Sequence, residues 1–118
     1  MQTDTTAERV ALNQHAFREA NERVEQAAAE IAPHLALIPF LCECPNRECT
    51  EVVRLTRGEY EDVRQNGKTF FVAPGHEVVE VDGVAVAKIA ARLERFSKMQ
   101  KLGEAGEVAE SLDRRASD

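Results

Sequence analysis

The chain has 118 residues and a formal net charge of −6, and it contains three cysteines and no tryptophan. This length predicts one domain with at most a small appendage. The acidic balance disfavours nonspecific binding along a phosphate backbone, and no apolar run approaches the roughly 20 residues that span a bilayer. Hydrophobic residues make up 43% of the chain, but many are alanine and only 5% of all residues are aromatic. We therefore expect a thin core that a structural metal ion would help to stabilise.

A capping box predicts the start of the first helix. Thr5 and Glu8 have the S/T-x-x-E spacing of this motif, and the helix should run to about Ile31 before Pro33 ends it. Charged side chains, including Arg18, are assigned to its outer faces. Apolar residues recur at spacings of three, four and seven, as in a heptad stripe; these are Val10, Phe17, Ala20, Val24, Ala27 and Ile31.

This narrow stripe is the basis of the partner prediction. Residues 1–33, of which 1–4 are expected to be disordered, form an N-terminal amphipathic helix ahead of a compact module over 34–113. The stripe can pack on that module or pair with a second helix. We therefore expect either self-association or a protein partner at this helix.

All three cysteines lie close together in the chain. Cys42, Cys44 and Cys49 have the spacing C-x-C-x4-C, and Pro45-Asn46 between them predicts a tight turn. Such a turn folds Cys49 back towards the first two cysteines. Three thiolates could then meet at one point, as they do in structural zinc sites.

A histidine would complete the set of four ligands. His76 lies in the turn formed by residues 73–77, Ala-Pro-Gly-His-Glu, and would give the Cys3His set of a zinc knuckle. His34, eight residues before Cys42, is the competing imidazole. We favour His76 because a Pro-Gly turn that follows a strand can hold a side chain rigidly.

Other interpretations of the three thiols stay open. A disulfide framework is expected to have an even number of cysteines in a secreted chain, whereas here the number is odd and no signal peptide begins the sequence. Redox-active thiols, an iron–sulfur cluster of uncommon spacing and three buried cysteines without a metal are the remaining alternatives. Reduced thiols without a leader predict a cytoplasmic protein.

The residues around the cysteines predict a hairpin and a short helix. We expect strands over 40–44 and 50–55, with the cysteine loop at the tip of the hairpin. A second capping box, Thr56 with Glu59, predicts a helix that begins at Arg57. Tyr60 and Val63 should face inward.

The rest of the chain predicts two more strands and two more helices. A third strand covers 68–73, and a short strand to Val81 leads into a helix that Asp82 caps and that ends near Glu94. A hairpin with an Asp-Gly turn at 82–83 is the competing interpretation. A strand over 95–102 and a helix over 104–112 follow, and 113–118 are expected to form a frayed tail, disordered over 114–118. The fold class is therefore α+β.

Several of these segments resemble a group of small, uncharacterised bacterial proteins. Its pattern is found here in Asn21-Glu22-Arg23 and in residues 40–49, 55–64, 70–77 and 103–109. The cysteine and Pro-Gly-His-Glu segments are the most specific parts. The departure is residues 78–93, which are longer than the group leads us to expect. The resemblance supports the ligand set and implies no activity.

The predicted function is that of a non-enzymatic, zinc-binding interaction or regulatory protein. Four protein ligands leave no open position, whereas catalytic zinc keeps one for water. Glu43, Glu48 and Glu77 flank the ligands and are expected to support them or to be solvated. The chain has no Gly-rich phosphate loop, serine elbow or His-Glu-x-x-His motif.

Two alternatives to this function are kept. In the first, the thiols form a redox sensor that releases zinc on oxidation. In the second, the knuckle binds nucleic acid, but no aromatic stacking platform accompanies its basic residues, and we expect neither a nucleic acid nor a membrane as partner. The basic run consists of Lys88, Arg92, Arg95, Lys98 and Lys101.

Overall fold

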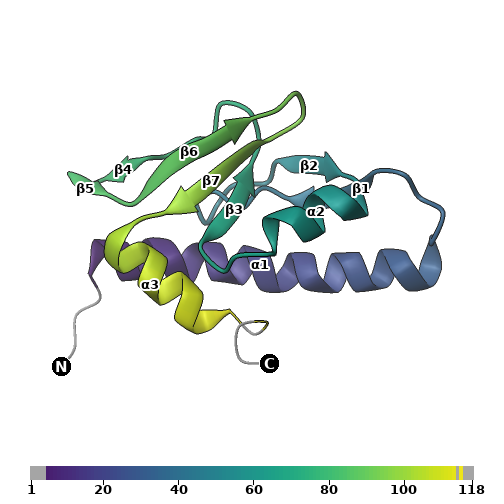
Figure 1. The fold of residues 1–118 in the computed structure, drawn as a ribbon, viewed down its shortest axis with the longest axis horizontal. Coiled ribbons are helices and arrows are strands. Elements are labelled where there is room, and N and C mark those ends of the chain that lie inside the picture. Colours follow the sequence, from purple (N-terminus) through teal and green to yellow (C-terminus); the bar gives the residue numbers. More distant parts are fainter. Residues whose placement is uncertain (1–4, 114, 116–118) are drawn as a thin grey trace.

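The computed structural model of the protein describes residues 5–113 and 115 and shows an α+β fold (Figure 1). A long helix runs along one side of the molecule, and the first strand and the C-terminal helix pack against it. The elements are α1 (Thr6–Ile31), β1 (Ile38–Leu41), β2 (Val52–Leu55), α2 (Arg57–Val63), β3 (Thr69–Val72), β4 (Glu80–Val81), β5 (Val84–Ala85), β6 (Ala87–Arg92), β7 (Ser97–Lys101) and α3 (Gly103–Leu112). None of the described helices is long and apolar enough to cross a membrane.

Both predicted capping boxes are present. In α1 the Thr5 hydroxyl accepts the Glu8 N–H, and the Glu8 carboxylate accepts the Thr5 N–H, each at 3.0 Å. In α2 the same reciprocal bonds join Thr56 and Glu59 at 3.0 and 2.8 Å. Both helices therefore begin at the predicted residues, because each box satisfies N–H groups that the first helical turn leaves unpaired.

The strands form three small antiparallel sheets. β1 and β2 make the predicted hairpin, in which Ile38 pairs with Leu55 and Leu41 with Val52. The first strand covers Ile38–Leu41 rather than 40–44, and the second covers Val52–Leu55 rather than 50–55. A three-stranded sheet has the order β3-β7-β6, and β4 pairs only with β5. The predicted strands over 68–73 and 95–102 correspond to β3 and β7, and the final predicted helix corresponds to α3.

The predicted helix from Asp82 to about Glu94 is wrong. Asp82 and Gly83 have φ angles of 51° and 79°, as the two central residues of a type I′ hairpin turn require, and the chain continues as β5 and β6. A register shift between Ile89 and Ala91 adds an unpaired residue to β6. This bulge interrupts the alternation of a strand, and it explains why apolar spacings of three suggested a helix.

An aromatic cluster forms the centre of the core. The rings of Phe40 and Tyr60 stack with centroids 4.3 Å apart. The Phe71 ring contacts them edge-on at 6.0 and 6.1 Å, and contacts Phe96 at 6.4 Å. Tyr60 and Val63 are fully buried, as predicted. This cluster therefore joins β1, α2, β3 and the residue before β7, and Cys42 and Cys44 of the cysteine loop are buried in the same core.

The buried face of α1 differs from the predicted stripe. Val10 is buried, but Ala27 is exposed and Ile31 is 82% exposed. Arg18, which was assigned to an outer face, is only 3% exposed. The face that packs inward consists of Ala7, Val10, Ala11, Gln14, Arg18 and Asn21. The apolar spacing was misleading because half of this face is polar. Hydrogen bonds to the rest of the protein compensate for the burial of these polar side chains.

The C-terminal residues that the structure describes are held by ion pairs, so the expectation of fraying is wrong for them. Both terminal nitrogens of Arg64 donate to the Asp113 carboxylate, at 2.7 and 3.0 Å, and both side chains are at most 4% exposed. Arg115 donates to Glu22 and Glu61, each at 2.9 Å. Residues 114 and 116–118 of the predicted tail, and the predicted disordered residues 1–4, lie outside the described part of the chain.

Replacing Asp113 by alanine is expected to lower the free energy of unfolding by about 3 kcal/mol at neutral pH, because Arg64 would stay buried without this partner. Burial raises the pKa of Asp113, but hydrogen bonds from Arg64 outweigh it and lower that pKa below its ordinary value. The ion pair therefore contributes fully above the unfolded pKa of about 3.9, and its contribution is lost as the pH falls through the lowered value.

Urea unfolding at pH 7 and at decreasing pH measures this difference. The control is Asp62→Ala, which removes an ion pair with Lys98. This pair lies at the surface, since the Asp62 side chain is 64% exposed. This control is expected to change the free energy by less than about 1 kcal/mol. Equal losses in the two variants would contradict the expected role of the buried pair.

Candidate metal centre

The cysteine loop, residues 42–49, connects β1 to β2 and turns back at its tip. The Asn46 side chain accepts the Glu48 N–H and its carbonyl accepts the Cys49 N–H, both at 3.0 Å. The Cys42 N–H donates to the Glu51 carbonyl at 3.0 Å, so the hairpin pairing continues to the first cysteine. The predicted turn therefore returns Cys49 to the side of Cys42.

A second turn, after β3, presents the histidine. The His76 N–H donates to the Ala73 carbonyl at 2.9 Å, and Gly75 has a φ of 91°, a conformation that favours glycine. The Glu77 carboxylate accepts the Gly75 N–H at 3.1 Å and the Ser97 hydroxyl at 2.6 Å. Glu77 therefore ties the turn to β7 and holds the imidazole in place.

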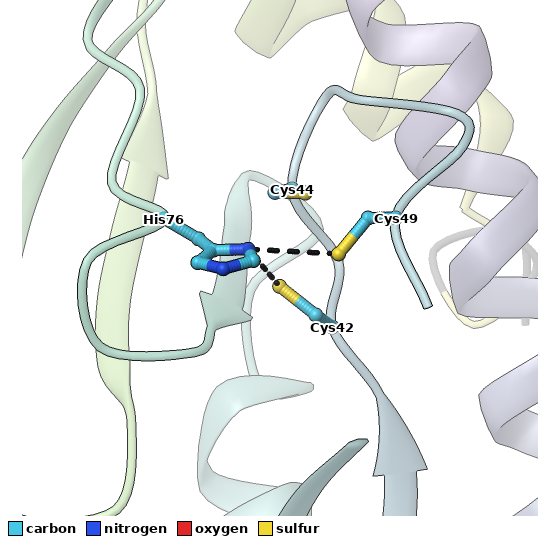
Figure 2. Close-up of side chains that lie close together, drawn as sticks. All are labelled: Cys42, Cys44, Cys49 and His76. Atoms are coloured by element: carbon cyan, nitrogen blue, oxygen red, sulfur yellow. Dashed lines mark hydrogen bonds between the residues drawn. The ribbon is translucent and has the colours of Figure 1, made fainter. Parts of the chain in front are cut away.

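The two turns bring the four predicted side chains together (Figure 2). One ligand atom from each of Cys42, Cys44, Cys49 and His76 lies within 4.8 Å of the other three. The His76 Nδ1 atom is 3.7 Å from the Cys42 sulfur and 3.5 Å from the Cys49 sulfur. His34, the competing imidazole, is exposed and lies outside this group.

The two sulfur–nitrogen separations suit a tetrahedral metal ion. Bonds of about 2.3 Å to sulfur and about 2.05 Å to nitrogen, at tetrahedral angles, place a sulfur and a nitrogen ligand about 3.6 Å apart. The two sulfur–nitrogen distances, 3.7 and 3.5 Å, agree with this value. Three thiols and an imidazole in this arrangement are compatible with metal binding.

The environment of the thiols makes one of them acidic. The hydrogen bond from the Cys42 thiol is the main cause that lowers the pKa of Cys44 to about 5. The same bond, together with burial, raises the pKa of Cys42, and burial raises that of Cys49. The Ala73 N–H donates to the Cys42 sulfur at 3.2 Å. One thiolate therefore forms readily, and binding of a metal ion would displace the remaining protons.

Glu43, between the first two cysteines, is fully buried and points towards α1. Arg18 donates to its carboxylate at 2.8 Å and Asn21 donates to it at 3.0 Å. The exposed fractions of the Arg18 and Glu43 side chains are 3% and 0%. The Arg18 guanidinium also lies 3.8 Å from the centroid of the Phe70 ring. Glu43 is thus neither solvated nor a base beside the sulfurs.

Side chains of α1 also bind the backbone of this segment. The Asn21 side chain pairs with both backbone groups of Leu41, accepting its N–H at 2.8 Å and donating to its carbonyl at 2.9 Å. The Gln14 side chain donates to the Glu43 carbonyl at 2.7 Å. The side-chain amides of Gln14 and Asn21 therefore supply backbone hydrogen bonds of the kind that a neighbouring strand usually provides.

The roles of Gln14, Arg18 and Asn21 were missed from the sequence. One signal was available: in Cys-Glu-Cys, side chains that alternate put both sulfurs on one side and Glu43 on the other. A carboxylate forced inward needs a buried cation. Which cation supplies it depends on tertiary packing.

The basic run is largely neutralised within the molecule. Arg92, Arg95 and Lys98 form ion pairs with Glu77, Glu59 and Asp62, at 3.6, 2.8 and 2.8 Å. Lys101 is buried, and burial, with the nearby charge of Arg18, lowers its pKa to about 7. Four of the five basic residues therefore have an acidic partner or are buried, whereas Lys88 is exposed.

The chain matches no protein-family model, no curated protein and no solved structure. Compatibility with metal binding rests on the geometry of the four clustered side chains.

Proposed function

We propose that Cys42, Cys44, Cys49 and His76 bind one zinc ion, and that the protein is a small zinc-stabilised interaction or regulatory protein without enzymatic activity. The observation that supports this most is the agreement of the two sulfur–nitrogen distances, 3.7 and 3.5 Å, with a tetrahedral site. A set of three sulfurs and one nitrogen in a tetrahedron is typical of zinc.

The proposed role of the ion is structural. Four protein ligands complete its coordination, so no position is left for a water or a substrate. Glu77, the acidic residue next to His76, is engaged by Ser97 at 2.6 Å and is therefore suited to orienting the turn rather than to proton transfer. The ion would join the β1–β2 hairpin to the turn after β3.

The partner that we propose is a protein or a second copy of this chain, bound at α1 in the cytoplasm. Leu12 is 43% exposed and Ile31 is 82% exposed, and both lie on this helix. They lie about 100° apart around the helix axis, so they offer two separate apolar contacts to a partner rather than one continuous face. The neutralised basic run supports the exclusion of nucleic acid.

The matched pair His76→Ala and His34→Ala tests the ligand set. Wild-type protein is expected to contain about one zinc per chain by elemental analysis. The His76 variant should bind zinc with an affinity reduced by more than the roughly 10–100-fold that loss of an outer-shell contact causes. The His34 variant should keep the wild-type affinity, since this residue lies outside the group.

Competition with a chromophoric chelator measures both affinities. Wild-type protein that carries no zinc and takes up none would refute the proposed function. Equal zinc affinity in the two variants would refute the assignment of His76 and leave the three cysteines as candidates.

A thiol redox sensor is the second candidate, and the exposure of Cys49 favours it. Cys42 and Cys44 are buried, whereas Cys49 is only partly buried and can be reached from solvent. Two of the thiolates would form a disulfide and transfer two electrons to a peroxide, whose O–O bond breaks with uptake of protons to give water, and zinc would leave. Zinc release within minutes of mild peroxide treatment is expected for a sensor. Retention of zinc would exclude this function.

A further inference from the structure

The segment from Leu41 to Cys44 lies between two sets of contacts. On one side Cys42 and Cys44 face His76. On the other side Glu43 faces α1, where Arg18 and Asn21 hold its carboxylate at 2.8 and 3.0 Å. Because the two sulfurs and this carboxylate belong to consecutive residues, a backbone rotation at residue 43 that turns the carboxylate away from α1 also moves the sulfurs.

The contacts on the α1 side are short, buried and numerous. In addition to the Glu43 carboxylate, α1 holds the Leu41 backbone through Asn21 at 2.8 and 2.9 Å, and the Glu43 carbonyl through Gln14 at 2.7 Å. The Arg18 guanidinium is itself fixed by the Thr69 carbonyl at 2.7 Å and by the Phe70 ring. The position of Glu43 is therefore set by α1 and by β3.

Because Glu43 and Arg18 are both charged and buried, the position of Glu43 depends on Arg18. Glu43 is a fully buried carboxylate between two cysteines in the sequence. Arg18 is the buried cation that forms an ion pair with it, and the charge of Glu43 also acts on the buried Lys101. A buried carboxylate without a cation is strongly destabilised and turns towards water. Without Arg18, Glu43 would therefore move outward and carry Cys42 and Cys44 away from a common centre.

We propose that Arg18 and Asn21 are positioning residues of the metal centre, so that docking of α1 and binding of the metal ion form one linked equilibrium. This inference rests on the proposed zinc site. Linkage is reciprocal: whatever docked α1 adds to the metal affinity, bound metal adds to the docking of α1. The metal content of the site would thus control how firmly the helix proposed to bind partners is held.

The test compares Arg18→Gln with Arg23→Gln, the same change at an exposed arginine of the same helix. Zinc affinity is measured by chelator competition, and thermal unfolding is followed with zinc and with chelator. Arg18→Gln is expected to weaken zinc binding by about 10–100-fold, the effect of losing an outer-shell partner. The rise in Tm that zinc causes should therefore be smaller for Arg18→Gln than for the wild-type protein. Arg23→Gln should stay within about twofold of wild type, as expected for a surface change.

The increase in Tm caused by zinc separates positioning from a structural role. If Arg18 were only structural, Arg18→Gln would lower the Tm equally with zinc and with chelator, and the zinc affinity would stay at the wild-type value. That result would overturn the inference and leave the zinc site intact. A wild-type protein that binds no zinc would overturn the proposed function together with this inference.

If Arg18→Gln does not fold, Asn21→Ala is the second variant, and the same two outcomes support or overturn the inference.

Hydrogen exchange in the wild-type protein gives an independent measure of the linkage. Amides of residues 13–21 are expected to exchange faster when zinc is removed, whereas those of β6 and β7 should change less. Unchanged exchange over 13–21 after zinc removal would also overturn the inference.

Discussion

Removing the metal ion is expected to lower the free energy of unfolding by about 4 kcal/mol, for a protein measured at a free zinc concentration about 1,000 times its dissociation constant. For a chain of this length the corresponding fall in Tm is on the order of 15 °C. The physical reason is that the cysteine loop and the turn after β3 would be joined by the ion. Without it, these two segments would lose the bonds that join them, although Cys42, Cys44 and Ala73 would still contribute to the core.

The fold is not expected to be lost entirely. The cluster of Phe40, Tyr60, Phe71 and Phe96 contains no side chain of the metal centre, and it joins β1, α2, β3 and the residue before β7. Far-ultraviolet circular dichroism should therefore show a cooperative but earlier transition in the chelated protein. The control is His76→Ala, whose Tm should change little on chelation. A wild-type Tm that chelator does not change would contradict the structural role of the ion.

Replacing Phe71 by alanine is expected to lower the free energy of unfolding by about 4 kcal/mol. Phe71 is fully buried, and its ring contacts three other aromatic rings edge-on, with centroids 6.0 to 6.4 Å away. Truncation would remove these contacts and leave a cavity that the surrounding strands can only partly fill. Because Phe71 lies among the four aromatic rings at the centre of the larger core cluster, its loss would be felt throughout that cluster.

Urea unfolding of the zinc-loaded protein measures this loss. The control is Leu93→Ala at a 47% exposed position, which is expected to change the free energy by about 0.5 kcal/mol or less. Phe71→Leu should lose less than Phe71→Ala, because it retains more of the buried volume. A loss in Phe71→Ala below about 1.5 kcal/mol would contradict the central position of this ring.

Local signals in the sequence were sufficient for much of the fold. Both capping boxes begin a helix at the predicted residue. The hairpin around the cysteine loop and the inward positions of Tyr60 and Val63 were predicted as well. The convergence of three cysteines and His76 could be predicted because each lies in or beside a turn that a short motif specifies.

The errors have a common origin in longer-range effects. The segment after Asp82 carries both an Asp-Gly turn and a helical apolar spacing, and pairing of β6 with β7 selects the turn. The buried face of α1 was wrongly assigned because Gln14, Arg18 and Asn21 look like solvent-facing residues in a helical pattern. Only Glu43 and the backbone of Leu41, which lie far away in the chain, make their burial favourable.

The sequence by itself determined where α1 and α2 start, that the chain turns at the cysteines and at Pro74-Gly75, and which four side chains meet, because caps and turns act over a few neighbouring residues. Tertiary structure alone decided that α1 turns a polar face inward and that Arg18 pairs with Glu43. The physical reason is that burial of a charge is favourable only beside its counter-charge. Arg18 and Glu43 are 25 residues apart in the sequence, so the packing of α1 brings them together and no local pattern does.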